Sequence, residues 1–210
     1  MKKGTISILI GLLLLAAALM LECVDLAQDK AAGTDSAAVL EELEPAIEPE
    51  PIPIEGRQTR SGEQSEGEME YPDYVLDPDM ALPTVEIDGQ RYVGTLSLPT
   101  LEIELPVNDV CDYDRLFKTP CRYTGTAYRN DLVICAHNYR RHFGRIKTLR
   151  YGDEVTFTDV DGNVFRYRVL EIENLWPNEV DRMKTGEWDL TLFTCSKTGR
   201  TRVTVRCERV

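Results

Sequence analysis

Short runs of alternating apolar and polar residues dominate the chain after residue 83. Residues 91–107, RYVGTLSLPTLEIELPV, give two extended pieces that meet at Pro99. Alternation with a period of two is typical of a half-buried β-strand, because successive side chains point to opposite faces. The same pattern predicts further strands at residues 131–137, 189–195 and 201–210.

Turn and helix signals connect these runs. Residues 153–172 predict a β-hairpin in which Asp161 and Gly162 form a two-residue turn. Short helices are predicted at residues 112–119 and at residues 177–186, and the second begins with Pro and ends with Gly. Strands at such regular spacing predict an all-β fold with small helices, in the form of a closed or nearly closed β-barrel.

An apolar run precedes this region. The 16 residues from Ile6 to Leu21 follow Lys2 and Lys3, which is the pattern of an export segment. As a helix the run would be about 24 Å long, which is short against a hydrocarbon core of about 30 Å. We predict an uncleaved membrane anchor at residues 1–24, with the rest of the chain outside the cytoplasm. A cleaved signal peptide is the alternative, because small residues occur near the end of the run.

The net charge of −12 is concentrated in one part of the chain. Residues 22–79 contain 17 acidic and three basic residues, whereas residues 80–210 contain 19 of each. The acidic part includes EPAIEPEPIPIEG and has almost no aromatic residues, so it is too polar to bury a core. We predict a disordered, acidic, proline-rich spacer at residues 25–82 and one folded domain at residues 83–210. A domain of balanced charge on an acidic spacer argues against nucleic acid as a partner.

The candidate reactive residues are six cysteines and two histidines, namely Cys23, Cys111, Cys121, Cys135, Cys195, Cys207, His137 and His142. An even number of cysteines outside the cytosol invites disulfides. A Cys111–Cys121 disulfide across the first predicted helix and free thiols are alternatives that the sequence leaves open. A cysteine–histidine catalyst has to use either His137, which ends a strand, or His142, which lies in a basic loop.

The two faces of the last predicted strands separate the cysteines. In TLFTC, the two leucines mark the core face, so Cys195 lies on the less apolar face at the strand end. In TRVTVRC, Cys207 lies on the apolar face and is most simply a core residue. The polar face carries Arg202, Thr204 and Arg206, and it would lie beside Cys195 if the last two strands form a hairpin. We expect Arg206 to lie beyond reach of Cys195 and Arg200 to be a solvated turn residue, so that replacing either affects activity much less than replacing Arg202.

A cysteine, a histidine and an arginine at three strand ends suit acyl transfer. A thiolate is a nucleophile, an imidazole can move a proton to or from a leaving group, and a guanidinium can hold the charge on a carbonyl oxygen. The motif TLFTC, with the arginine of TRVTVR after it and a strand-ending histidine before it, resembles the signature of the sortases. Sortases are membrane-anchored cysteine transpeptidases of mainly Gram-positive bacteria. The resemblance covers residues 83–210, and Ala136 replaces the glycine that many sortases have before the histidine.

The resemblance implies a closed barrel of about eight strands. It also implies that Cys195 is the nucleophile, His137 the acid and base, and Arg202 the oxyanion-binding or substrate-positioning residue. The implied substrates are surface proteins with an LPxTG-like C-terminal sorting signal. The implied acceptor is an amine, either of a lipid-linked cell-wall precursor or of a pilin lysine. No cofactor and no metal are implied.

The loop before the TLFTC strand is expected to help bind the sorting signal. Trp176, Trp188 and Thr194 are the predicted contacts, although each tryptophan has a core position as its alternative. A class B sortase would carry a long helix in this loop, and here the predicted helix is brief. The subclass therefore stays open, with a class B-like type as one option.

Two alternative functions belong to other classes. An extracytoplasmic metal-binding module would use Cys135, His137, Cys195 and Cys207 as ligands, but it lacks the usual spacing of zinc sites and Cys207 has apolar flanks. A non-catalytic module that only binds sorting signals is disfavoured because cysteine, histidine and arginine are all present.

Overall fold

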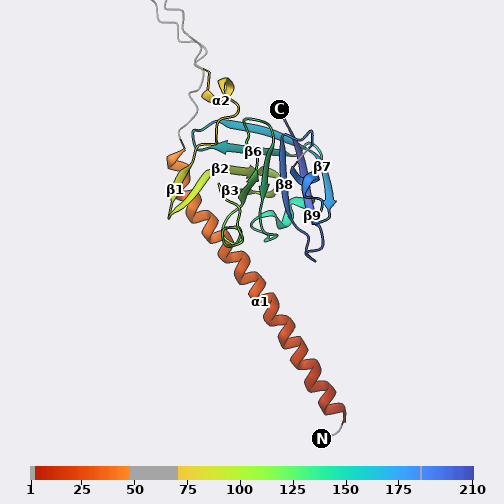
Figure 1. Cartoon of the computed structure of the whole chain (residues 1–210). Helices are drawn as coiled ribbons and strands as arrows, with labels where there is room; N and C mark the ends of the chain where they lie inside the picture. Colours follow the sequence, from red (N-terminus) through yellow and green to blue (C-terminus); the bar gives the residue numbers. More distant parts are fainter. Residues whose placement is uncertain (1–2, 48–70, 185) are drawn as a thin grey trace, which may run out of the picture.

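The computed structural model describes residues 3–47, 71–184 and 186–210. The strands of these residues form one mixed sheet, with a long helix leaving its side (Figure 1). In chain order the elements are α1 (Lys3–Leu43), η1 (Glu44–Ala46), α2 (Asp73–Leu76), β1 (Val85–Ile87), β2 (Gln90–Leu98), η2 (Pro99–Leu101), β3 (Ile103–Asn108), α3 (Tyr113–Leu116), β4 (Cys121–Thr124), β5 (Leu132–Cys135), η3 (Phe143–Thr148), β6 (Glu154–Asp159), β7 (Val164–Leu175), α4 (Val180–Lys184), β8 (Leu190–Cys195) and β9 (Arg202–Arg209).

The sheet closes on itself to form a barrel. Its strand order is β1-β2-β3-β4-β5-β8-β9-β7-β6, and β2 pairs with β6 as well. This additional pairing joins the two ends of the order, so eight of the nine described strands form a ring and β1 only extends its hairpin with β2. The structure confirms the predicted all-β fold with small helices and a closed barrel of about eight strands.

The ring closes through a glycine. Gly94 of β2 is the cross-strand partner of Asp159 in β6, and its φ is +150°. A Cβ atom on Gly94 would lie 2.0 Å from the backbone oxygen of Thr158, so this close approach of the two strands requires glycine. Large apolar side chains, including those of Phe157 and Phe165, fill the interior of the ring and are completely buried.

Most strands predicted from alternation are present. β2 and β3 are the two extended pieces on either side of Pro99, and β6 and β7 form the predicted hairpin. The hairpin turn has three residues rather than two, because the Asp159 amide donates to the carbonyl of Asn163 (3.1 Å) and Gly162 has a φ of +84°. The Asp159 carboxylate accepts from the Asp161 and Asn163 amides, which fixes this longer turn. β1 and β4 have three and four residues, too few to show alternation in the sequence.

The N-terminal apolar run is the first part of a longer helix. α1 spans 41 residues and extends away from the barrel (Figure 1). Its large apolar side chains between Ile8 and Leu26 are exposed, and the helix is long and apolar enough to cross a membrane. Residues 25–43 continue this helix, so the disorder predicted from residue 25 onward is wrong for this segment.

Residues 25–43 are helical because one helix face packs on the barrel. Ala32, Ser36 and Leu43 are buried and recur at the spacing of a single helix face. Leu43 packs with buried residues of β1 and β2. The acidic residues that suggested disorder, such as Glu41, are exposed on the helix, and Ala, Leu and Glu are good helix formers. The average charge of the segment therefore concealed an amphipathic helix.

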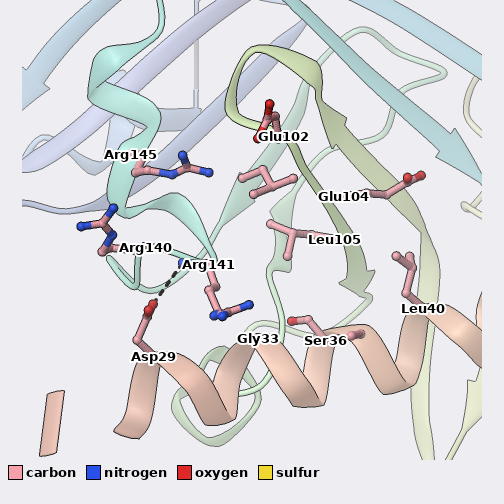
Figure 2. A pocket seen from close by; sticks show the side chains of 12 residues that line it. Asp29, Gly33, Ser36, Leu40, Glu102, Glu104, Leu105, Arg140, Arg141 and Arg145 are labelled. Carbon is pink, nitrogen blue, oxygen red and sulfur yellow. Dashed lines mark hydrogen bonds between the residues drawn. The ribbon is translucent and has the colours of Figure 1, made fainter. Parts of the chain in front are cut away.

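Figure 2 shows how α1 meets the barrel. Asp29 accepts a hydrogen bond from the backbone amide of Arg141 (3.0 Å). Ser36 donates to the carbonyl of Lys118 (2.7 Å). A cavity of about 420 Å³ lies beside these contacts, between α1 and the side chains of Glu102, Glu104, Arg140, Arg141 and Arg145. Polar contacts and apolar packing together hold the helix on the barrel.

The last part of the predicted spacer also packs on the barrel. Tyr74 of α2 stacks on Tyr128, with ring centroids 4.7 Å apart and an interplanar angle of 7°, and Leu82 is buried in the main core. The predicted disorder is therefore wrong for residues 71–82, where a few apolar side chains outweigh the surrounding charge. Residues 44–47 follow α1 and include η1, and the rest of the predicted spacer, residues 48–70, lies outside the described residues.

His142 lies between α1 and the barrel rather than in a solvated loop. Its side chain is 0% exposed, and its Nε2 lies 3.0 Å from the Ser36 hydroxyl oxygen. Because that hydroxyl donates its only proton to Lys118, it accepts a hydrogen bond from His142. Burial lowers the pKa of His142 to about 4, since a charged imidazolium is poorly solvated there.

We expect this histidine to make the stability of the chain depend on pH. The pKa of an unfolded histidine is about 6.5. Between about pH 6.5 and about pH 4, the unfolded chain binds a proton that the folded chain does not bind. The free energy of unfolding should therefore decrease by up to about 3 kcal/mol as the pH falls through this window, and the contribution should be fully retained above it. Chemical denaturation of the full chain in detergent across this pH range measures the decrease.

Two variants show whether His142 is the cause. His142→Asn should lose this part of the pH dependence, because the titrating group is gone. Ser36→Ala is the matched control, since it removes the hydrogen bond but leaves the imidazole buried, and it should keep the dependence. An unchanged pH profile in His142→Asn would contradict burial of this histidine as the origin of the effect.

Candidate active site

Two parallel strands end side by side at the candidate site. β5 and β8 pair in parallel, with Cys135 opposite Phe193, and the Ala136 amide extends the ladder by donating to the carbonyl of Phe193 (3.2 Å). Parallel strands have their carboxyl ends at the same edge of a sheet. Two residues past the Cys135–Phe193 pair, His137 and Cys195 lie at this edge, as the strand-end pattern predicted.

The last strand adds an arginine at the same edge. β8 and β9 form the predicted hairpin, in which Cys195 and Arg202 are cross-strand partners. Side chains of such partners begin about 5 Å apart at their Cβ atoms. Cys195 therefore has the strand of His137 on one side and Arg202 on the other.

One pocket of about 320 Å³ is lined by all three of these residues. Cys195 is partly exposed in it. The structure thus brings together the cysteine, histidine and arginine that the sequence singled out. Most of the remaining wall is aromatic or aliphatic, and its residues include Tyr113, Leu116, Tyr123, Pro177, Val180, Met183 and Phe193. The sequence indicated only the loop before β8, which supplies Pro177, Val180 and Met183, as a contributor to the site. It did not indicate the other wall residues, because they come from segments that are far apart in the chain.

The imidazole of His137 is surrounded by aromatic rings. Its ring centroid lies 4.7 Å from that of Phe117, 5.0 Å from that of Tyr139 and 5.8 Å from that of Tyr113. Partial burial in this apolar setting lowers its pKa. Its Nε2 is buried and has no hydrogen-bond partner within the described residues. The ring is therefore held in place by packing rather than by a hydrogen bond to its Nε2.

In the hydrogen bonds that the structure shows for Arg202, its guanidinium donates only to nearby backbone oxygens. Its Nη1 donates to the carbonyls of Gly199 (3.2 Å) and Thr201 (3.3 Å), both in or next to the turn between β8 and β9. None of the ion pairs between described residues involves Arg202. Its positive charge is therefore not neutralised by a carboxylate there.

The predicted substrate-binding residues are only partly at the pocket. Thr194 lines it, but the hydroxyl is buried and donates to the carbonyl of Ala136 (2.8 Å), which ties β8 to the end of β5. Trp176 is 60% exposed, and Trp188 lies near Arg206, 6.0 Å from ring centroid to guanidinium carbon. Neither tryptophan is among the described residues that line the pocket; the same connection supplies Pro177, Val180 and Met183 instead.

Arg206 is buried, although the sequence pattern placed it on the polar face of the last strand. It is 1% exposed. Its Nε donates to Glu173 (3.0 Å), its Nη1 to the Thr191 hydroxyl (2.9 Å) and its Nη2 to the carbonyl of Arg182 (2.6 Å). The connection between β7 and β8, which contains α4, covers this end of the polar face. Arg206 thus fixes the connection that forms one wall of the pocket. Its cross-strand partner is Thr191 rather than Cys195, and the smaller effect of its replacement on activity, relative to Arg202, stays a prediction.

Comparison with known proteins shows the family. A family model described as Sortase domain matches residues 96–210, which is more than half of the chain. The chain belongs to the sortase family. It is accordingly a cysteine transpeptidase, as the strand-end cysteine and the TLFTC motif predicted. Sortase A of Bacillus anthracis is 22% identical over 149 residues, which cover 68% of this chain and 70% of the relative.

Solved sortase structures share the fold. The structure of sortase C of Clostridium perfringens with the C-terminal cell wall sorting motif is 26% identical, with a TM-score of 0.50 over 57% of this chain and 70% of that chain. Sortase C of Streptococcus pneumoniae is 22% identical, with a TM-score of 0.51 over 60% of this chain and 70% of that chain. The second likeness is one of fold alone. The closed barrel of this chain is therefore a sortase barrel.

The geometry also bears on the subclass and on the metal-binding alternative. α4 has only five residues, so the described part of the loop lacks the long helix that a class B type would carry. Cys207 is 0% exposed in the core and pairs with Leu190 at the opposite end of β8 from Cys195. The four proposed metal ligands therefore do not converge. Among the described residues, no group of three or more His, Cys, Asp and Glu side chains is arranged to hold a metal ion.

We expect Arg206→Ala to lower the free energy of unfolding of this sortase by about 3–5 kcal/mol. The substitution removes the cation that one carboxylate oxygen of Glu173 and two backbone carbonyls use, and among the described residues Glu173 keeps only the exposed Arg182 as an ion-pair partner. Arg200→Ala is the matched control, because Arg200 is exposed in the turn after β8 and its loss should change stability by less than about 0.5 kcal/mol. Urea denaturation of the full chain in detergent compares the two. Equal small losses would show that the Arg206 network contributes no more than a surface charge.

Proposed function

We propose that this sortase cleaves an LPxTG-like C-terminal sorting signal on surface proteins and transfers each protein to an amine through a thioacyl-enzyme. The observation that carries the proposal is the convergence of Cys195, His137 and Arg202 on one largely apolar pocket. These groups can supply a nucleophile, a proton carrier and an oxyanion donor, which are the three chemical functions that transpeptidation needs.

In the first half-reaction, the Cys195 thiolate attacks the carbonyl carbon of the threonine in the signal. A carbon–sulfur bond forms and the carbonyl oxygen becomes an anion, to which the Arg202 guanidinium donates hydrogen bonds. When this tetrahedral intermediate collapses, the carbon–nitrogen bond breaks. His137, as an imidazolium, gives its proton to the leaving nitrogen. The products are a thioester on Cys195 and the released C-terminal peptide.

In the second half-reaction, an acceptor amine attacks the thioester. His137, now neutral, takes a proton from the attacking nitrogen, and the carbon–sulfur bond breaks to restore the Cys195 thiolate and the imidazolium. The acceptor is the amine of a lipid-linked cell-wall precursor or of a pilin lysine. A cavity of about 780 Å³ between α1 and the barrel is also lined by His137, together with Asp29 and Tyr139. This cavity supports approach of the acceptor from the side of α1.

The apolar pocket suits the leucine and proline of such a signal. Val180, Met183 and Phe193 provide aliphatic and aromatic surface next to Cys195, and burial of apolar side chains against such a surface favours binding. Thr194 contributes by fixing the ends of β5 and β8. Trp176 and Trp188 would reach the signal only if a longer part of it follows the β7–β8 connection.

We further propose that α1 anchors the enzyme in the cell membrane as a single-pass protein, with the catalytic domain outside the cytoplasm. The exposed apolar side chains of its first part support this proposal, because no other described part of the chain covers them. Proteins bearing the sorting signal would then meet the enzyme at the extracytoplasmic face of the cell membrane. Sortase C of Streptococcus pneumoniae is described with a pilin substrate specificity, which makes a pilin lysine one acceptor to test.

We expect Cys195→Ala and His137→Asn to reduce cleavage of an LPxTG-type peptide by more than about 10³-fold, because each removes a group that takes part in bond making or proton transfer. Cys23→Ala and His142→Asn are the matched controls, since Cys23 is exposed on α1 and His142 lies between α1 and the barrel. Both controls should keep cleavage within a few-fold of the wild type. Peptide cleavage followed by mass spectrometry measures all four. Full activity in Cys195→Ala would refute the proposed mechanism.

We expect Arg202→Lys to fold normally and to turn over the same peptide about 10²–10³-fold more slowly. Lysine keeps the charge but lacks the fork of two donors that fits an oxyanion. Some thioacyl-enzyme should still form, and mass spectrometry of the intact protein detects it. Arg200→Lys is the matched control in the adjacent turn and should lose little. Equal, small losses in both variants would show that backbone amides hold the oxyanion instead.

A further inference from the structure

Three cysteines that the proposed reaction does not use lie together beside the active-site pocket. Cys121 of β4 and Cys135 of β5 are cross-strand partners in the antiparallel ladder. Cys111, in the segment after β3, has its Sγ atom 3.0 Å from the Sγ atom of Cys135. Bonded sulfur atoms are about 2.05 Å apart, so a shift of about 1 Å brings this pair to bonding distance. We propose that Cys111 and Cys135 form a disulfide when the domain is outside the cytoplasm.

Access favours this pair over the two other pairings in the cluster. Cys111 and Cys135 both line the active-site pocket of about 320 Å³. Cys111 is partly exposed, so a small oxidant that enters the pocket reaches it, and the buried Cys135 lies next to it. Cys121 is 0% exposed and is not among the described residues that line the pocket. Its sulfur lies 3.6 Å from the carbonyl oxygen of Thr119, within reach of a weak hydrogen bond. The sequence raised Cys111–Cys121 as the alternative to free thiols, whereas the geometry points to Cys135 as the partner.

The chemical environment makes Cys111 the reactive member of the pair. Hydrogen bonds from Cys121 and from Cys135 lower the pKa of Cys111, while the hydrogen bond to Cys111 and burial raise the pKa of Cys135. The Cys111 thiolate attacks one sulfur of a low-molecular-weight disulfide, which forms a mixed disulfide and releases one thiolate. Cys135 then loses its proton and attacks the Cys111 sulfur, which releases the second thiol. Two cysteine thiols are oxidised and one small disulfide is reduced to two thiols, so electrons and protons balance.

The disulfide would link the β3–β4 segment, which forms the aromatic wall of the pocket, covalently to β5. Residues 109–120 connect β3 to β4 and carry Tyr113 and Phe117, which surround the imidazole of His137. His137 itself follows Cys135 by two residues. A covalent link from Cys111 to Cys135 therefore fixes both sides of this contact. The proposal rests on the positions of the thiols and on the proposed location outside the cytoplasm, and it is independent of the proposed transpeptidation.

Peptide mapping tests the pairing directly. The full chain is exported in a bacterial host, its free thiols are blocked with N-ethylmaleimide before lysis, and the protein is digested with trypsin without reduction. Trypsin cleaves after Arg115, Arg122 and Arg129, so each of the three cysteines lies on its own peptide and each possible pair gives a different cross-linked mass. A linked pair of the Cys111 and Cys135 peptides is expected. Recovery of both as blocked thiols, or a link of either to the Cys121 peptide in their place, would overturn the proposal.

Serine variants and thermal unfolding add a second, independent readout. Cys111→Ser and Cys135→Ser should lose the link, and Cys121→Ser is the matched control that should keep it. A bond that closes the loop between residues 111 and 135 restricts the unfolded chain, so reduction with dithiothreitol should lower Tm by about 5–10 °C in the wild type and in Cys121→Ser. The other two variants should show no such shift. A shift that survives in Cys111→Ser, or that disappears in Cys121→Ser, would contradict the assignment.

Discussion

The parallel pairing of β5 with β8 is the interaction on which the candidate site depends. Hydrogen bonds between the two strands fix their register, with Cys135 opposite Phe193, and so set where the next residues of each chain emerge. All four residues of β5 are buried, as expected for a strand in parallel pairing that is covered on both faces. The Thr194 hydroxyl donates to the carbonyl of Ala136 and extends the pairing past the end of the ladder. A slip of one residue would turn Cys195 to the other face.

The connections between strands shape the pocket, whereas the strands place the reactive groups. The β3–β4 segment supplies the rings around His137, and the β7–β8 connection supplies the aliphatic wall. Arg206 holds the second of these connections from inside the sheet, through bonds to Glu173 and to the carbonyl of Arg182. A buried guanidinium with this many partners fixes one loop geometry, because any other geometry leaves its charge unsatisfied. Rigid strands and anchored connections thus meet at one pocket.

The docked part of α1 links the apolar N-terminal segment to the catalytic domain. The helix is held by a buried leucine that packs against β1 and β2. Asp29 also contacts the segment after β5, and Ser36 contacts the segment before β4. The cavity next to His137 has residues of α1 as one of its walls. The helix therefore contributes to the surroundings of the site as well as to the proposed attachment to a membrane. This arrangement differs from a domain on a flexible spacer, because the helix and the barrel share buried contacts.

The sequence by itself determined the elements whose signals are local. Alternation predicted most strands, the TLFTC motif and the strand-end histidine predicted the central residues of the site, and the face of Cys207 predicted its place in the core. Tertiary structure alone decided the rest. The sequence concealed the helix at residues 25–43. Its acidic residues are visible in the local sequence, whereas the barrel surface that buries Leu43 comes from distant parts of the chain. Arg206 looks like Arg202 in a strand pattern, and only the chain folded over it makes one buried and leaves the other at the pocket. Cys111 and Cys135 are 24 residues apart in the sequence, and no local pattern shows that their sulfur atoms meet, because that contact is created by the pairing of strands and the path of the segment between them.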